Sequence, residues 1–295
     1  RDLVRSRGLG DVYKRQVIMG LLLYNRFKMA IKQTAVTNTE NMVENTVEKL
    51  DADLLNVRQI TNAVNYNIIQ EYDISSRDFN RQFSLLYEIN ADKIQSMALY
   101  DDKGNLLTAE PVTVQKDAVE PSEQDWYQDA EADIENIHFS IPHIQNLFVD
   151  GTYRYYWVVS LSRSVDINDG EQPGSGVLLV DMKYSVIEET LARINDASNG
   201  IYYYLCNRDG QMIYHPRGTD MDRGYFKEEY RDAATYEDGT YELTVNGRTS
   251  NVIVNSVAYT GWKVVGVVPE SVQIASINRF RYYICLLYTS PSARD

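Results

Sequence analysis

Two stretches of the sequence decide the predicted fold: MALYDDKGNLL at residues 97–107 and YYLCNRDGQMIY at residues 203–214. Each has strand-forming residues on both sides of a short polar segment that contains a glycine, Gly104 in the first and Gly210 in the second. Glycine supplies the positive φ that a tight turn needs, so each stretch predicts a β-hairpin. Because the pattern occurs in both halves of the chain, the sequence predicts an internal repeat.

Each predicted hairpin is followed later by an apolar strand that leads into a helix-like segment. In the first half the strand is residues 176–181 and the helix is residues 184–194. In the second half the strand is residues 261–268 and the helix is residues 270–284. Repeats of this size indicate two stacked modules rather than a solenoid, and the mixture of helices and hairpins predicts an α+β fold.

A long helix is predicted before the first hairpin, because residues 29–72 contain no glycine or proline and their apolar positions recur in steps of four and three. These positions form a seam made of Val43, Val47, Leu50, Leu54, Val57, Val64 and Ile68, with Thr61 in one further place. Two interpretations stay open: the seam packs on the rest of the domain, or it pairs with a second copy of the chain, and both can hold along different parts of the helix. A shorter helix is predicted at residues 78–93, after the capping signal Ser75-Ser76.

Composition excludes some classes of function. The chain has 42 acidic and 29 basic residues and a net charge of −13, which argues against a nucleic-acid partner because phosphate binding needs a basic surface. Of the two cysteines, only Cys206 lies away from the chain ends, and a buried, inert thiol is expected there. No catalytic motif and no metal-ligand spacing is present, so we predict no catalytic residues, metal or cofactor. A hydrolase built on scattered carboxylates stays open on sequence alone.

The two ends of the sequence resemble translated DNA rather than protein. Residues 11–16 can be encoded by a transposon-end oligonucleotide used for sequencing libraries, and residues 285–290 by its reverse complement. We therefore predict that residues 1–16 and 285–295 are adapter sequence and leave them out of the fold prediction.

Apolar segments adjoin these ends and suggest a membrane. Residues 17–28 are predicted to be the end of a truncated transmembrane helix with its juxtamembrane segment, and residues 270–284 a helix leading into a second one. Basic residues flank both segments on the domain side, which usually marks the cytoplasm, but that rule is weak for long translocated domains.

This order of elements resembles that of the double Cache (dCache) sensor domains of bacterial transmembrane receptors. The resemblance rests on the opening helix, the two hairpins, Asp125-Trp126-Tyr127 after a loop, the strand ending in Val180-Asp181, and GWKVV at residues 261–265. It covers residues 29–283 and is strongest to sensor histidine kinases of the YesM type. It implies two stacked PAS-like modules with antiparallel sheets: helices at residues 29–94, a membrane-distal module at 95–199 and a membrane-proximal module at 200–269.

The resemblance also implies a ligand site in the distal module. Amino-acid-sensing members carry an Arg-x-Trp-Tyr motif, a downstream aromatic residue and an Asp at the end of a late strand. In this chain Trp126 and Tyr127 match the Trp-Tyr pair, and Asp181 matches the Asp. His143 lies near the expected aromatic position, and Gln124 stands where the Arg would be. These five are the predicted ligand-binding residues.

The change from Arg to Gln at position 124 bears on the ligand, because Gln cannot offer a carboxylate the charged, bidentate fork of Arg. An amine, a sugar-like molecule or another neutral polar molecule therefore fits better than a strict α-amino acid, although an amino-acid-like ligand stays open. Structural alternatives stand beside these roles: Trp126 as a packing anchor, Asp181 as a helix N-cap, and for His143 a structural or surface role, which we favour. The aromatic runs at residues 153–157 and 202–204 are interpreted as strand residues.

Together, these features predict a non-enzymatic, extracytoplasmic ligand-sensing domain at the bacterial cell membrane. It would form a homodimer and pass a conformational shift through its flanking helices, with a histidine kinase as the favoured output. The alternatives are the sensor domain of a chemoreceptor, or a membrane-tethered binding or adhesion protein without signalling output.

Overall fold

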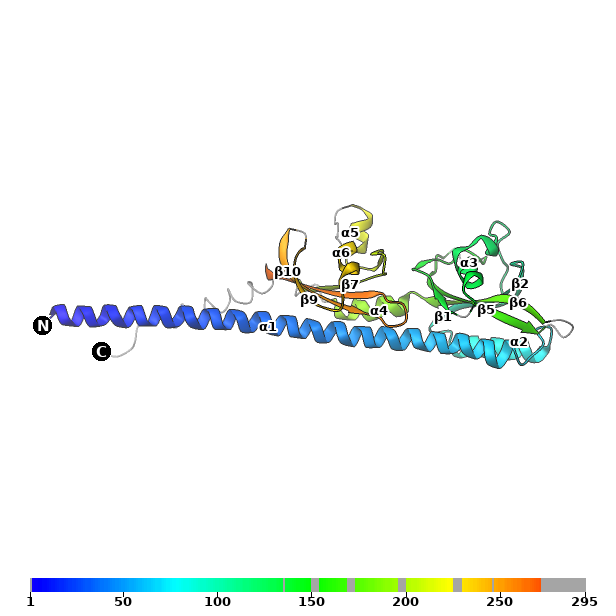
Figure 1. The fold of residues 1–295 in the computed structure, drawn as a ribbon, viewed down its shortest axis with the longest axis horizontal. Helices are drawn as coiled ribbons and strands as arrows, with labels where there is room; N and C mark the ends of the chain where they lie inside the picture. Colours follow the sequence, from blue (N-terminus) through cyan, green and yellow to red (C-terminus); the bar gives the residue numbers. More distant parts are fainter. Residues whose placement is uncertain are drawn as a thin grey trace.

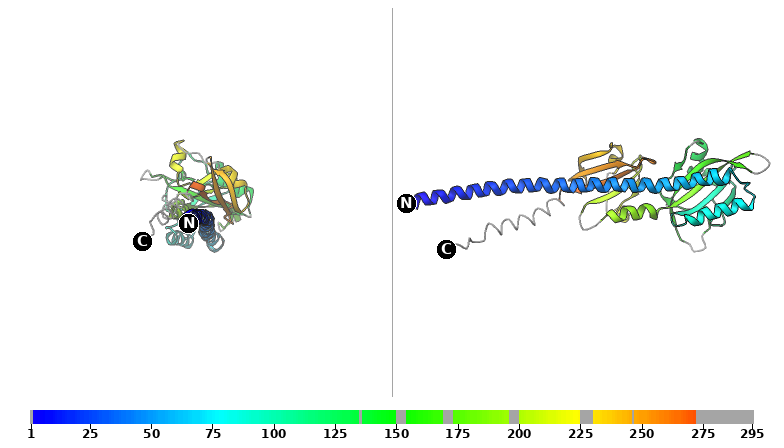
Figure 2. Two further views of the ribbon diagram at one scale, coloured as in Figure 1. Left: turned by 90° about the vertical axis from the view of Figure 1, so that its left-hand side faces the viewer. Right: turned by 90° about the horizontal axis from the view of Figure 1, so that it is seen from below.

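The computed structural model describes residues 2–134, 136–149, 154–168, 173–195, 200–224, 230–245 and 247–271. Its longest element is helix α1 (Asp2–Val64), which continues into a π-helical turn, η1 (Asn65–Ile69). Helix α1 runs along one side of two β-sheets, and its N-terminal part projects beyond both of them (Figure 1). Helix α2 (Arg77–Ile89) lies beside the C-terminal end of α1 (Figure 2) and begins at Ser76, whose Oγ accepts a hydrogen bond from the Phe79 N–H. Both helices were predicted from the sequence.

The first sheet is antiparallel, with the strand order β2-β1-β6-β5-β3 and with β4 paired to β5. Its strands are β1 (Ile94–Asp101), β2 (Leu106–Glu110), β3 (His138–Phe139), β4 (His143–Ile144), β5 (Trp157–Asn168) and β6 (Pro173–Lys183). The turn η2 (Pro121–Glu123) and helix α3 (Asp125–Ala132) lie over the face of this sheet that points away from α1 (Figure 1).

The second sheet repeats this arrangement, with the order β8-β7-β11-β10-β9. Helix α4 (Ser185–Ile194) connects the sheets, and the strands are β7 (Tyr202–Cys206), β8 (Met212–Tyr214), β9 (Gly239–Val245), β10 (Arg248–Ser256) and β11 (Lys263–Pro269). The short helices α5 (Gly218–Asp222) and α6 (Tyr230–Thr235) lie on the side away from α1 (Figure 1). In both sheets the hairpin forms one edge and the last strand is central, so the predicted α+β fold of a long helix and two antiparallel modules is confirmed.

The two hairpin turns correspond residue by residue. The side chain of Asp101 in the first and of Asn207 in the second each accepts hydrogen bonds from the backbone N–H groups two and four residues further along. Gly104 and Gly210 follow at the same distance and have φ values of 79° and 75°. The predicted glycine turns are therefore present, and they fix how the two sheets are compared.

With these turns matched, the strand pairing gives equivalent positions in the two sheets. In the first sheet Asp181 on β6 is paired with Ser96 on β1 and with Ser160 on β5. In the second sheet one residue of β11 has the matching partners on β7 and β10. The counterparts of Asp181, Ser96 and Ser160 are Val267, Tyr202 and Val252.

The apolar seam of α1 is covered by the chain itself. Val43, Leu50, Leu54, Val57 and Val64 are at most 1% exposed and belong to one apolar core that includes residues of both sheets. The interpretation that the seam packs on the domain is therefore confirmed. The fully buried positions of the seam therefore have no free surface for a second copy, and pairing along another part of α1 stays a prediction.

Helix α1 lies especially close to the second sheet at Gly266 on β11. A Cβ atom placed on Gly266 would be 2.6 Å from Thr39 Cγ2 and 2.9 Å from Val43 Cγ2. Any larger residue would have to push α1 and the sheet apart. The equivalent residue of the first sheet is Val180, which is fully buried in the core.

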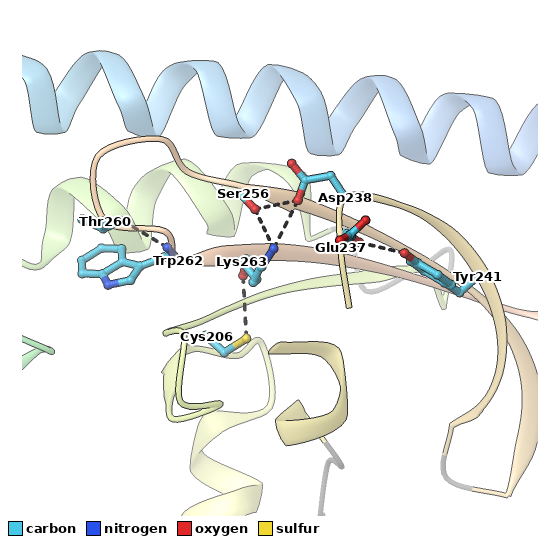
Figure 3. Close-up of polar contacts among 8 residues, drawn as sticks. All are labelled: Cys206, Glu237, Asp238, Tyr241, Ser256, Thr260, Trp262 and Lys263. Atoms are coloured by element: carbon cyan, nitrogen blue, oxygen red, sulfur yellow. Dashed lines mark hydrogen bonds and ion pairs between the residues drawn. The ribbon is translucent and has the colours of Figure 1, made fainter. Parts of the chain in front are cut away.

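A small polar cluster lies where β9 begins, β10 ends and β11 begins (Figure 3). Lys263 Nζ donates hydrogen bonds to Ser256 Oγ at 2.6 Å and to Asp238 Oδ1 at 3.3 Å, and Ser256 Oγ donates to Asp238 Oδ1 at 2.6 Å. Beneath it the thiol of Cys206 is fully buried and points toward the Lys263 carbonyl. Burial raises the pKa of Cys206 to about 12, so this thiol is inert, as predicted.

Among the described residues no helix has the length and apolar composition needed to cross a membrane. Several large apolar side chains in the projecting part of α1 are exposed: Ile18, Met19, Leu21, Leu22, Leu23, Phe27 and Met29. The described residues end at residue 271. Most of the predicted second membrane-approaching helix, residues 270–284, and the segment 285–295 therefore lie outside them. Residues 2–16 form the first part of α1, and their adapter origin stays a prediction. The predicted module boundaries also stay predictions.

Candidate functional site

A cavity of about 350 Å³, hereafter the first cavity, lies on the first sheet, on the face away from α1. Its walls come from the start of α3, from the segment around β4 and from β6. The lining residues are Gln124, Asp125, Trp126, Ser140, Ile141, His143, Ile144, Gln145, Asn146, Leu147 and Asp181. The fold thus brings together four of the five predicted site residues: Gln124, Trp126, His143 and Asp181.

The fifth predicted residue, Tyr127, does not line this cavity. Its side chain is 1% exposed, and its hydroxyl donates a 2.8 Å hydrogen bond to the backbone carbonyl of Asp101 in the hairpin turn. Successive residues on an α-helix point in directions about 100° apart, so Trp126 and Tyr127 face different neighbours. Tyr127 anchors α3 to the hairpin instead.

Trp126 combines the two roles considered for it. It is 8% exposed, and its ring packs against Tyr100 with the ring centroids 5.4 Å apart. It also lines the first cavity. An indole held firmly on one side and facing a cavity on the other is suited to contact a ligand through its π-face.

Asp181 lies within β6 and is 1% exposed. Ser160 Oγ donates a 2.5 Å hydrogen bond to its Oδ1, and Ser96 Oγ donates a 2.7 Å hydrogen bond to its Oδ2. Helix α4 begins four residues later, and its N-cap position is Tyr184. The alternative that Asp181 is a helix N-cap is therefore wrong, and the carboxyl group belongs to the floor of the first cavity.

Among the described residues that line the first cavity, the basic side chain near Asp181 is His143. Burial raises the pKa of Asp181 above its usual range, although the hydrogen bonds from Ser160 and Ser96 and the charge of His143 act in the opposite direction. None of the described residues that line the first cavity is Lys or Arg. The side chains near the carboxyl group are neutral amides, hydroxyls and His143, so a ligand that brings a positive charge would be stabilised there.

His143 lines the first cavity and contacts Ser160, which is hydrogen-bonded to Asp181 in the cavity floor. It is half-buried on β4, with Nε2 3.3 Å from Ser160 Oγ and Nδ1 3.1 Å from the Ile141 carbonyl oxygen. The structural role favoured from sequence fits these contacts, and His143 lines the cavity as well.

His143, Ser160 and Asp181 do not form a hydrolytic triad. In a Ser-His-Asp triad the histidine stands between the other two residues, whereas here the serine does, and it donates its proton to Asp181. Among the described residues no group of three His, Cys, Asp or Glu side chains could hold a metal ion.

The sequence prediction missed several polar residues on the same face of the sheet. Besides Ser96 and Ser160, the buried Tyr100 and Ser162 lie there, and neither hydroxyl has a hydrogen-bond partner among the described residues. Buried polar atoms are normally paired, so these two hydroxyls are exceptions on this face of the sheet, and neither residue is among those that line the first cavity. A signal was present: serines alternate with apolar residues along residues 159–162. That pattern alone indicates a solvent-exposed face, which here is covered by α3.

Comparison with known proteins agrees with the fold. The profile of the Cache domain family, dCache_1, matches residues 27–277. A probable methyl-accepting chemotaxis protein of Bacillus thuringiensis is 20% identical over 90% of this chain and 38% of its own length. The chemotaxis protein TlpB of Bacillus subtilis is 23% identical over 77% of this chain and 30% of its own length. The chain therefore spans less than two fifths of these curated relatives.

Solved structures of chemoreceptor ligand-binding domains have the same fold. The domain of Mlp24 with asparagine has a TM-score of 0.61 at 15% identity and covers 85% of this chain and 98% of its own. The domain of Pseudomonas aeruginosa PctC with GABA has a TM-score of 0.59 at 19% identity, with coverages of 78% and 99%. Because the family profile matches most of the sequence, the chain belongs to the double Cache family of ligand-sensing domains.

Proposed function

We propose that this chain is the extracytoplasmic sensor domain of a bacterial transmembrane receptor and that its first cavity binds a small amine. The observation that carries the proposal is Asp181, a buried carboxyl group with no Lys or Arg among the described residues that line its cavity. Each carboxylate oxygen already accepts one serine hydrogen bond and retains a lone pair for a second donor. A ligand ammonium group, with its three donors, would fill these places.

The wall of the first cavity supports the same ligand class. The indole of Trp126 offers a face for a cation–π contact, and the second lining carboxylate, Asp125, adds negative charge. A carboxylate on the ligand would meet neutral amides such as Gln124, Gln145 and Asn146 and no Lys or Arg among the described lining residues. The relatives solved with asparagine and with GABA hold ligands that carry an ammonium group, which supports an ammonium subsite here. A sugar-like ligand is the alternative, since Asp181 could also accept hydroxyl hydrogen bonds.

Binding would alter the receptor through α1. Ser160 on β5 donates a hydrogen bond to Asp181 in the floor of the first cavity. Its neighbours Val159 and Leu161 belong to the core beneath, which includes α1. A shift of β5 on binding would therefore reach α1 directly. A ligand can move this equilibrium only by its differential affinity for two states.

The output of the receptor is a separate part of the proposal. The order of sequence elements favours a sensor histidine kinase, whereas the curated relatives are chemotaxis proteins and favour a chemoreceptor. The continuous gene, recovered from long sequencing reads, distinguishes a kinase domain from a methyl-accepting domain. A stop codon or a cell-wall anchor after residue 284 would favour a tethered adhesion protein and overturn both. We further propose a homodimer, through a surface other than the buried seam.

The ligand proposal is tested by calorimetry on the full chain with putrescine, GABA and L-asparagine, each beside its N-acetylated analogue. At least one amine should bind, and its acetylated form should not. Asp181→Asn should weaken binding at least about ten-fold, because hydrogen bonds to charged groups are among the strongest. Asp129→Asn, which removes an exposed carboxylate of α3 that does not line the cavity, is the matched control and should change affinity much less. Equal binding of the acetylated analogues, or unchanged affinity in Asp181→Asn, would contradict the proposal.

A further inference from the structure

The second sheet carries a cavity of its own, of about 710 Å³, hereafter the second cavity. It is bounded by the end of α4, by the segment after β8, and by strands β7, β10 and β11. The lining residues are Ala192, Asn195, Gly200, Ile201, Tyr202, Tyr214, Pro216, Arg217, Val245, Arg248, Ser250, Val267 and Pro269. Nothing in the amine proposal involves this cavity.

The two cavities share one equivalent position. Val267, which lines the second cavity, is the counterpart by strand pairing of Asp181, which lines the first. Their other walls come from different elements: α3 and the β4 segment in the first cavity, and the end of α4 and the segment after β8 in the second. Each sheet therefore has a cavity beside the same position of its central strand.

The charge of the second cavity is the reverse of the first. Two arginines, Arg217 and Arg248, line it, and its described lining contains no Asp or Glu. Arg248 stands at the first position of β10 and forms no ion pair within the part of the chain that the structure describes. A guanidinium group directed toward a cavity with no acid on its walls favours an anionic ligand.

Arg217 is held in position by its own neighbours. Its backbone N–H donates a 2.9 Å hydrogen bond to His215 Nδ1, and its Nε donates a 3.0 Å hydrogen bond to Asp220 Oδ2. An arginine that is fixed before a ligand arrives loses less conformational entropy on binding than a mobile one. The site is therefore partly preorganised for a negative group.

The remaining walls of the second cavity are mainly apolar. Val245, Val267 and Ile201 contribute aliphatic surface, and Tyr202 and Tyr214 contribute aromatic rings. In the first cavity the equivalent floor is polar, with serine hydroxyls around a carboxyl group. A ligand for the second cavity needs an apolar body beside its negative charge, since a small inorganic anion would leave this surface uncovered.

We propose that the second cavity is a separate binding site for a small organic acid, whose carboxylate pairs with Arg248 and Arg217 and whose apolar body lies against Val267 and the tyrosine rings. The receptor would then sense two ligands of opposite charge, an amine on one sheet and an acid on the other. Because the two cavities share no lining residue, each proposal can fail without the other.

The test uses the full chain and a series of carboxylates with growing apolar bodies: acetate, butyrate, phenylacetate and 4-phenylbutyrate. Calorimetry should show binding that strengthens along the series, and phenylacetamide, the neutral analogue of phenylacetate, should bind at least about ten-fold more weakly. Arg248→Gln should weaken phenylacetate binding to a similar degree, and Arg217→Gln less, because Arg217 already shares its charge with Asp220. Arg223→Gln, which removes an exposed arginine of the same module outside the cavity, is the matched control and should leave binding unchanged.

Three results would overturn this proposal. The first is that none of the four carboxylates binds at millimolar concentration. The second is that phenylacetamide binds as tightly as phenylacetate, which would exclude a role for the arginines. The third is that Arg248→Gln, with a thermal melt that matches the wild type, binds phenylacetate normally. If Asp181→Asn alters phenylacetate binding in that case, the ligand belongs to the first cavity instead.

Discussion

The two sheets of this domain have the same strand order and opposite chemistry at equivalent positions. Where the first sheet has Asp181 between Ser96 and Ser160, the second has Val267 between Tyr202 and Val252. The backbone repeat therefore determines where a cavity forms, and a few side chains determine what each cavity can hold. This separation of fold from site is general, and here it occurs within one chain.

The same repeat treats helix α1 differently on its two sheets. Gly266 lets the helix approach the second sheet closely, whereas the equivalent Val180 fills the space between helix and first sheet. Helix α1 therefore lies closer to the strand backbone of the second sheet, at Gly266, than to that of the first sheet, at Val180. Substitutions at these two positions test that contrast most strongly.

The largest effect is expected from Gly266→Val, which places on the second sheet the residue that the first sheet has. Its side chain would overlap Thr39 and Val43, and overpacking of this kind should lower the free energy of unfolding by about 3 kcal/mol. Urea denaturation followed by circular dichroism measures the loss. Gly174→Ala is the control, because a Cβ there meets nothing within 4 Å, and it should change stability by less than about 0.5 kcal/mol. A neutral Gly266→Val would contradict the close approach of α1.

A somewhat smaller loss is expected from Val180→Ala in the first sheet. Removing two buried carbon atoms from the core should lower the free energy of unfolding by about 2 kcal/mol, through lost burial and the cavity that remains. The same denaturation experiment applies, with the exposed Val112→Ala as a control that should leave stability unchanged. A neutral Val180→Ala would show that the packing of Val180 does not stabilise the first sheet. It would contradict the proposed difference between Val180 and Gly266.

The sequence predicted the parts of this fold that depend on local chemistry. The glycine turns at Gly104 and Gly210 and the cap at Ser76 are each determined by a few neighbouring residues, and all three are present. The seam of α1 was predicted as a pattern, but a heptad that packs on a sheet looks the same as one that packs on another helix. Only the three-dimensional structure shows which surface covers it.

The site was predictable only in part, because its residues depend on contacts between distant segments. Resemblance to a family selected Trp126, His143 and Asp181, which the fold brings to one cavity, and their ligand-binding role stays a prediction. It also selected Tyr127, which the helical geometry turns away. Ser160 became part of the site only because α3 and the β4 segment cover its strand. The second cavity was missed because Arg217 and Arg248 belong to separate segments and match no motif.

A smaller effect, of opposite sign in the two modules, is expected in the pH dependence of stability, beginning with Asp181. Burial raises its pKa in the folded state, so the folded protein binds this proton more tightly than the unfolded chain does. The resulting stability is fully present below the unfolded pKa, about 4, and is lost as the pH rises through the folded pKa. Relative to Asp181→Asn, the ligand-free wild type should therefore become less stable from pH 4 to pH 8. A wild type that gains stability relative to Asp181→Asn over this range would show that burial does not dominate at this carboxyl group.

The smallest effect concerns Asp238, in the polar cluster of the second sheet (Figure 3). Partial burial acts to raise its pKa, but the hydrogen bond from Ser256 and the Lys263 ammonium group outweigh burial, so the pKa of Asp238 lies below its usual range. Its contribution to stability is therefore present above the unfolded pKa and disappears as the pH falls through the folded pKa, the reverse of Asp181. Because the side chain is 51% exposed, Asp238→Asn should lower the free energy of unfolding at pH 7 by less than about 1 kcal/mol.

The effect of Asp238 on stability can be distinguished from general acid sensitivity by removing its hydrogen-bond partner, Ser256. Ser256→Ala removes the strongest hydrogen bond that lowers the pKa of Asp238 and leaves both charges in place. When Ser256→Ala is present, the stability change caused by Asp238→Asn should shrink, and most of its pH dependence should go with it. If that change keeps its full size without Ser256, the lowered pKa has another origin. The opposite pH responses would then no longer be explained by the burial of Asp181 on one sheet and by the hydrogen bond and ion pair of the exposed Asp238 on the other.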